Sequence, residues 1–170
     1  MISSLVDDLA QWNNFFVLVG TGSAALTGLV FVAMSINLKG VAKDATHRYR
    51  AINMLSGFTT AFLFSCLALF GHQTYLRLGI EWLIVALLAA AVNTNGYIKG
   101  FGSLGSRYAL SSVRIVGGST CYLGLIIGSL ILCFDSRAGI DVAAIALIAN
   151  FYFLISGSWL LIVGTLEVSD

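Results

Sequence analysis

The chain has 170 residues, of which 58% are hydrophobic and only 10% are charged, and its net charge is +1. About a quarter of the residues of a soluble domain are charged, so this composition excludes an ordinary soluble protein and predicts one that lies in a membrane. A net charge near zero provides no basic field for nucleic acid. The cysteines stand in apolar runs at irregular spacing, which predicts packed or lipid-facing thiols and neither a disulfide framework nor a zinc site: Cys66, Cys121 and Cys133.

Residues 1–12 predict a short amphipathic helix at the membrane surface. Apolar side chains recur there at helical spacing, and serine, aspartate and glutamine fill the opposite face. The apolar positions are Ile2, Leu5, Val6, Leu9 and Trp12.

Five apolar segments follow, each close to the ~20 residues that cross a bilayer core. They cover residues 15–37, 51–70, 78–98, 113–134 and 142–163. The connections are short, so consecutive segments are expected to run antiparallel. We therefore expect residues 13–170 to form one all-α transmembrane domain with five spans.

Lysine and arginine predict the orientation of this domain. With five crossings, seven of the nine basic residues fall on the side of the first and third connections and the C-terminus, and only Arg77 and Arg137 on the other. Cytoplasmic loops carry the excess of positive charge, so the N-terminus is expected outside and the C-terminus in the cytoplasm. If segment 78–98 did not cross, the split would be five against four. The charges therefore favour five crossings.

Small residues stand out in the first span, where Gly20, Ala24 and Gly28 form one smooth stripe. Helices in lipid associate through such stripes because their backbones approach closely there. Similar positions recur in the last two spans, at Gly124, Gly128, Asn150 and Gly157. These residues pack helices within one bundle or form contacts between subunits. The number of such faces favours a homo-oligomer.

The first span and its approach read WNNFFVLVGTGSAALTGLVFVAMSINL, from Trp12 to Leu38. This stretch resembles a pattern found in small uncharacterised bacterial multi-pass membrane proteins. The resemblance implies a bacterial inner membrane protein and carries no activity with it.

Gly100, Gly102 and Gly105 match the spacing of a dinucleotide fingerprint, but they follow a transmembrane segment and not a strand, so we expect no dinucleotide site. Basic residues surround this glycine-rich stretch, and they could hold the phosphate of an anionic lipid headgroup. The same residues are also expected there from the charge rule alone. The headgroup candidates are Lys99, Arg107 and Arg114.

No catalytic set can be assembled from the sequence. His47 and His72 are the only histidines, and neither has metal-ligand neighbours at a suitable spacing. Glu81 stands one helical turn after Arg77, which predicts a local ion pair. We therefore expect no enzyme, no metal and no cofactor.

Amides gather toward the cytoplasmic ends of the predicted spans, at Asn37, Asn53, Asn93 and Asn95, whereas the outer halves are mostly aliphatic or aromatic. Amides in hydrocarbon need partners or water. Either they bond across helices, or they line a wet cytoplasmic vestibule that an apolar outer plug closes.

Two functions fit this pattern. The first is a homo-oligomeric membrane protein that forms a pore or permeation path with a polar cytoplasmic vestibule. The alternative is an accessory or regulatory subunit that binds another membrane protein. No ring of charged residues is present to select ions in a pore.

Overall fold

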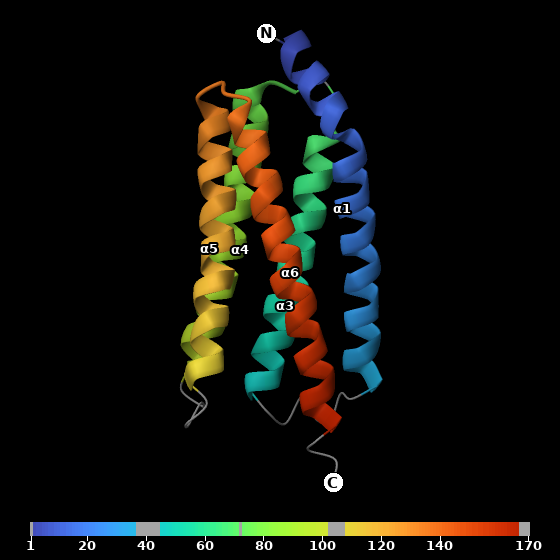
Figure 1. Ribbon diagram of the computed structural model, residues 1–170, viewed down its shortest axis with the longest axis vertical. Coiled ribbons are helices and arrows are strands. Elements are labelled where there is room, and N and C mark those ends of the chain that lie inside the picture. The colour runs from blue at the N-terminus through green and yellow to red at the C-terminus, as the bar shows by residue number, and fades with distance from the viewer. Residues whose placement is uncertain (1, 37–44, 72, 102–107, 167–170) are drawn as a thin grey trace.

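The computed structural model describes residues 2–36, 45–71, 73–101 and 108–166, and side chains over most of that range. These residues contain five α-helices and no strand, which confirms the predicted all-α fold (Figure 1). The helices are α1 (Ile2–Ile36), α3 (Ala45–Ala68), α4 (Tyr75–Phe101), α5 (Tyr108–Cys133) and α6 (Ala138–Leu166).

Each helix is long and apolar enough to cross a membrane. The apolar stretches lie close to the predicted segments, at Leu9–Ile36, Ala51–Ala68, Tyr75–Gly96, Val116–Cys133 and Ala138–Ser158. The chain contains no proline that would remove a helical hydrogen bond. The polar stretch of α4 remains helical because its own carbonyl groups satisfy it: Thr94 Oγ1 donates to Ala90 O at 2.8 Å and Asn95 Nδ2 to Ala91 O at 2.9 Å.

Consecutive helices run in opposite directions, as predicted (Figure 1). One end of the bundle holds the start of α1 and the α3–α4 and α5–α6 connections, and we name it the N-terminal end. The opposite end holds the last turn of α6, and we name it the C-terminal end. Which end faces the cytoplasm stays a prediction.

Helices α3, α4, α5 and α6 pack into a ring, and α1 packs mainly on the outside of α3. Glycine brings α5 and α6 into close contact. A Cβ atom built on Gly124 would lie 2.9 Å from Ala146 Cβ, and one on Gly128 would lie 2.9 Å from the Ala143 backbone nitrogen. Both predicted packing glycines of α5 therefore lie in an interface within the chain.

The residues predicted as a surface helix form the first turns of α1 and continue directly into its apolar stretch. At the N-terminal end of the bundle these turns tilt toward the ring of the other four helices (Figure 1). Leu9 and Trp12 pack against the main apolar core. Their position at a membrane surface stays a prediction.

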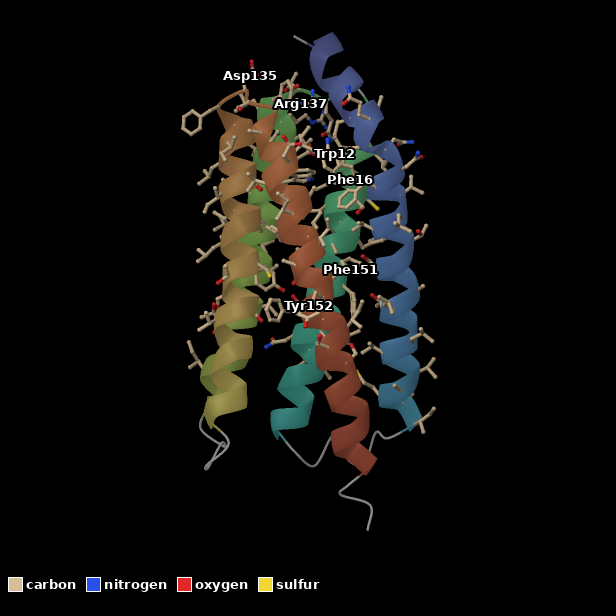
Figure 2. The ribbon with its side chains drawn as sticks, viewed as in Figure 1. Trp12, Phe16, Asp135, Arg137, Phe151 and Tyr152 are labelled. Atoms are coloured by element: carbon tan, nitrogen blue, oxygen red, sulfur yellow. The ribbon has the colours of Figure 1, made fainter. Side chains whose placement is uncertain are left out.

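Three aromatic rings fill the half of the bundle near the N-terminal end. Phe16, Phe64 and Trp82 are fully buried, and we call them the aromatic plug. The Trp82 ring stacks on Phe64 with centroids 4.9 Å apart, and its Nε1 donates to Phe64 O at 3.1 Å. Figure 2 shows Phe16 and Trp12 in this half and Phe151 nearer the middle.

Candidate functional site

Buried hydroxyl groups in the bundle are satisfied locally. Ser23, Ser65 and Ser129 are fully buried, yet each Oγ donates to the carbonyl oxygen four residues earlier at 2.6 to 2.9 Å. An amide side chain carries two donors and an acceptor, so its own helix backbone rarely satisfies all of them. Amide side chains are therefore the groups in which a donor or an acceptor is left without a partner.

Three buried side-chain atoms lack a hydrogen-bond partner within the described part of the chain: Asn53 Oδ1, Gln73 Oε1 and Asn150 Nδ2. Buried polar atoms in proteins almost always have a partner, either a protein group or an ordered water. A polar site with room for water would supply that partner. Asn53 and Asn150 lie within the apolar stretches of α3 and α6, where such atoms are costly.

Asn53 lies in the interface between α3 and α4. A Cβ atom built on Gly96 of α4 would overlap Asn53 Oδ1 and lie 2.8 Å from Asn53 Nδ2. Only the absence of a side chain at Gly96 allows the amide to lie this close to the α4 backbone. Gly96 was not among the predicted site residues.

Asn93 shares its face of α4 with Gly96, because residues three apart on a helix are neighbours. It is only 5% exposed, so it points into the bundle beside α3. Asn95 is exposed on the outer surface, where it donates to its own helix. Of the predicted vestibule residues, the structure therefore brings Asn53 and Asn93 to one interface and leaves Asn95 apart. Asn37 lies outside the described residues.

Asn150 is predicted as a helix-packing residue, and it is buried inside the ring at 2% exposure. One turn earlier on α6, Ala146 packs on Gly124 of α5. One turn later, Leu154 meets Gly57 of α3, where a Cβ atom would lie 2.9 Å from Leu154 Cδ1. Asn150 therefore adds a buried amide on a third helix, beside the buried Asn93 and the partly buried Asn53.

The contacts fix the heights of these amides along the bundle. Leu154 is level with Gly57, and the antiparallel helices place Asn150 one turn above that level and Asn53 one turn below. At 1.5 Å per residue the two amides are about 12 Å apart along the axis. Asn93 lies about 4.5 Å above Asn53, because it precedes Gly96 by three residues. We call Asn53, Asn93 and Asn150 the amide row.

The amide row extends from near the C-terminal end to the middle of the bundle, and the aromatic plug begins directly above it. Phe64 lies seven residues after Gly57 on α3, which places it about 4.5 Å beyond the level of Asn150. The amide row and the aromatic plug thus lie within one helical turn of each other, and an apolar cluster of Val30, Phe58 and Leu154 packs at the level of the amide row.

Other predicted packing residues divide between interior and surface. A Cβ atom on Gly20 would lie 3.2 Å from Ser65 Cβ, and one on Gly157 would lie 3.0 Å from Met54 Cε, so both glycines face α3. Ala24 is exposed, and a Cβ atom on Gly28 would have no neighbour within 4 Å. The outer face of α1 is therefore left without a contact at these two positions.

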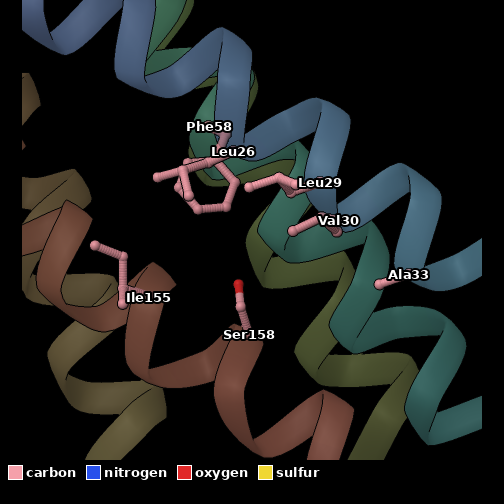
Figure 3. A pocket seen from close by; sticks show the side chains of 7 residues that line it. All are labelled: Leu26, Leu29, Val30, Ala33, Phe58, Ile155 and Ser158. Carbon is pink, nitrogen blue, oxygen red and sulfur yellow. The ribbon is translucent and has the colours of Figure 1, made fainter.

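A groove of about 170 Å³ lies between α1 and α6. Figure 3 shows side chains of α1 and α6 across the groove from one another, with Phe58 of α3 beside them. Ser158, its only hydroxyl group, donates to Leu154 O at 2.9 Å. The lining is otherwise apolar: Leu26, Leu29, Val30, Ala33, Phe58 and Ile155.

Polar contacts also connect neighbouring segments at the N-terminal end of the bundle. Arg77 Nε donates to Glu81 Oε1 at 2.9 Å, which confirms the predicted ion pair. Gln73 Nε2 donates to the other Glu81 oxygen at 2.9 Å, and Arg137 Nη2 donates to Gln11 Oε1 at 3.0 Å. The last contact ties the first turns of α1 to the start of α6.

The predicted lipid-phosphate site involves the C-terminal end. Lys99 and Arg114 belong to α4 and α5, but their side chains lie outside the described part of the structure, as does all of Arg107. Phosphate binding there stays a prediction.

The fold and its five apolar helices define a small multi-pass helical membrane protein. Comparison of the chain with protein-family models, curated proteins and solved structures gave no match.

Proposed function

We propose that the protein is a membrane permeation protein. Its polar path begins at the C-terminal end, follows the amide row to the middle of the bundle, and is closed there by the aromatic plug. The observation that carries this proposal is the pair of buried amide atoms without partners, Asn53 Oδ1 and Asn150 Nδ2. The charge rule and the resemblance of the first span support a bacterial inner membrane with the C-terminal end in the cytoplasm.

The chemistry of the two halves supports a gated path. Water or a polar solute on the amide row would supply the hydrogen bonds that the amides lack. The aromatic rings offer such a solute no hydrogen bonds to replace those that it makes with water or with the amides. An apolar constriction of this kind closes a path by losing its water. Opening requires movement of the Phe64 and Trp82 rings.

Thiol accessibility tests the proposal. In a chain whose three native cysteines are replaced by alanine, Asn93→Cys is expected to react with a small neutral methanethiosulfonate added at the C-terminal end. Ser65→Cys keeps the size of the buried serine next to the plug and is expected to resist. Equal resistance at both positions, in protein that elutes and melts like the parent, would contradict a polar path.

A second candidate function is a subunit that acts through assembly in the bilayer. It is favoured by the placement of α1, which packs mainly on α3 and leaves Ala24 and Gly28 uncovered. A second copy of the chain or another membrane protein would cover this face. The mass of the purified protein–detergent complex distinguishes these partners, because a homo-oligomer forms alone and an accessory subunit stays a monomer.

A further inference from the structure

We infer that the solute of this path is a small neutral molecule with both a hydrogen-bond donor and an acceptor, such as water or urea, and that the path excludes ions. This inference rests on the proposed permeation function and names its substrate class.

The two unpartnered atoms have opposite hydrogen-bonding character. Asn53 Oδ1 is an acceptor, so a molecule beside it must donate. Asn150 Nδ2 is a donor, so a molecule beside it must accept. A cation satisfies only the first atom and an anion only the second. A molecule that both donates and accepts can satisfy each in turn.

Within the apolar stretches of the described helices, formal charge is absent at the depth of the amide row, and Arg114, two residues before the stretch of α5, lies at the level where the row begins. The apolar stretches of the five helices contain only three charged residues, Arg77, Glu81 and Asp141. All three lie in the first turns of α4 and α6, at the N-terminal end and beyond the aromatic plug. Ion pathways through membranes are marked by charged groups or by rings of stacked carbonyl oxygens, because an ion must be compensated for its lost hydration. Three amides at three heights provide neither.

The spacing of the row suits small molecules that pass from one amide to the next. Asn93 lies about 4.5 Å above Asn53 and about 7.5 Å below Asn150 along the axis. One or two hydrogen-bonded waters bridge such intervals, since a hydrogen bond between oxygens spans about 2.8 Å. A larger solute would have to displace the packed contact between Leu154 and Gly57, which lies between these levels.

Flux through proteoliposomes tests the inference. Phe64→Ala removes one ring of the plug, and Phe64→Ala with Asn150→Leu then removes the donor in the middle of the row. The matched control adds Ile148→Leu, which changes an exposed residue two positions away. Water and urea fluxes are followed by light scattering, and potassium and chloride fluxes with ion-selective electrodes.

Phe64→Ala is expected to raise the water and urea fluxes above those of the parent, and Asn150→Leu to lower the raised fluxes about fivefold through the loss of one hydrogen bond. Potassium and chloride fluxes should equal those of protein-free liposomes in every variant. An ion flux that rises with Phe64→Ala and falls with Asn150→Leu would overturn the neutral-solute inference and leave the permeation path standing.

Unchanged fluxes of all four species would remove the permeation path itself. That conclusion requires variants that elute and melt cooperatively. If Phe64→Ala does not fold, Trp82→Phe replaces it, because that change removes the hydrogen bond to Phe64 O and keeps an aromatic ring.

Discussion

Near the N-terminal end the bundle buries Phe16 and Phe64 against Trp82, whereas near the C-terminal end it holds two buried amides, Asn93 and Asn150, and the partly buried Asn53. Asn53 and Asn150 each have an unpartnered atom. In the first half the rings contact one another and the indole N–H has a partner inside the chain, although Gln73 Oε1, beside the start of α4, has none. In the second half the chain leaves hydrogen bonds to be made by something else. One set of helices thus holds packed aromatic rings and unpartnered amide atoms about one turn apart.

The largest effect is expected in the plug. Trp82→Ala removes a fully buried ring that stacks on Phe64 and donates to its carbonyl oxygen. We expect a loss of about 3–5 kcal/mol in the free energy of unfolding, measured by reversible unfolding in mixed micelles. Leu88→Ala, at an exposed position of the same helix, is the control and should change little. Similar losses for the two variants would contradict a packed plug.

The next effect concerns the contact between Gly96 and Asn53. A methyl group at position 96 overlaps the Asn53 amide, so Gly96→Ala is expected to destabilise the protein by about 1–3 kcal/mol through overpacking. Adding Asn53→Ala removes the overlapping amide and should restore most of that loss. Unfolding of the two single variants and the double variant gives the coupling between the sites. Strictly additive losses would mean that the two residues do not touch.

A smaller effect is expected at Asn150. Because Asn150 Nδ2 has no partner, Asn150→Leu removes no hydrogen bond by that atom and keeps the branching at Cγ with a larger side chain. The unfolding free energy should stay within about 0.5 kcal/mol of the parent or rise. A loss of about 0.6–2 kcal/mol would instead indicate an interhelical hydrogen bond in a dry core, and the contrast between the two halves would disappear.

The smallest effect on stability is expected at Gly28. Gly28 is exposed and a Cβ atom there would have no neighbour within 4 Å in the described part of the chain, so Gly28→Leu should leave the melting temperature unchanged. If α1 forms a subunit contact, the same change should lower the mass of the detergent-solubilised complex. Gly20→Leu is the matched comparison, because it lies against Ser65 and should destabilise the chain itself. An unchanged mass with Gly28→Leu would remove α1 as the assembly surface.

Sequence alone predicted the number and places of the five helices, because long apolar segments are set by bilayer thickness. It also predicted that amides gather toward one end of the spans, and a vestibule formed by them stays a prediction. It did not predict which amides face inward, since that depends on how each helix is rotated against its neighbours. Asn93 and Asn95 illustrate this, because they lie two residues apart and on different sides of α4.

The inward face of α4 is visible only in the structure, because most residues of its apolar stretch are hydrophobic. Buried residues recur along it at intervals of three or four residues, at Trp82, Ala86, Ala89, Asn93 and Gly96. This period marks a single helical face. Asn150 was harder to assign, because its small neighbours on α6 are typical of plain helix packing. Its unpartnered atom depends on contacts with other helices, which no local pattern contains.

The reactivity of the native Cys121 thiol shows whether polar molecules reach the middle of the bundle. Gly124 meets Ala146, so Cys121, three residues earlier on α5, lies at about the level of Asn150 and is only 4% exposed. With Cys66 and Cys133 replaced by alanine, the rate at which a small neutral methanethiosulfonate modifies Cys121 is measured by mass spectrometry in intact proteoliposomes. The polar path predicts modification of Cys121 in the folded protein. Modification only after unfolding would contradict it.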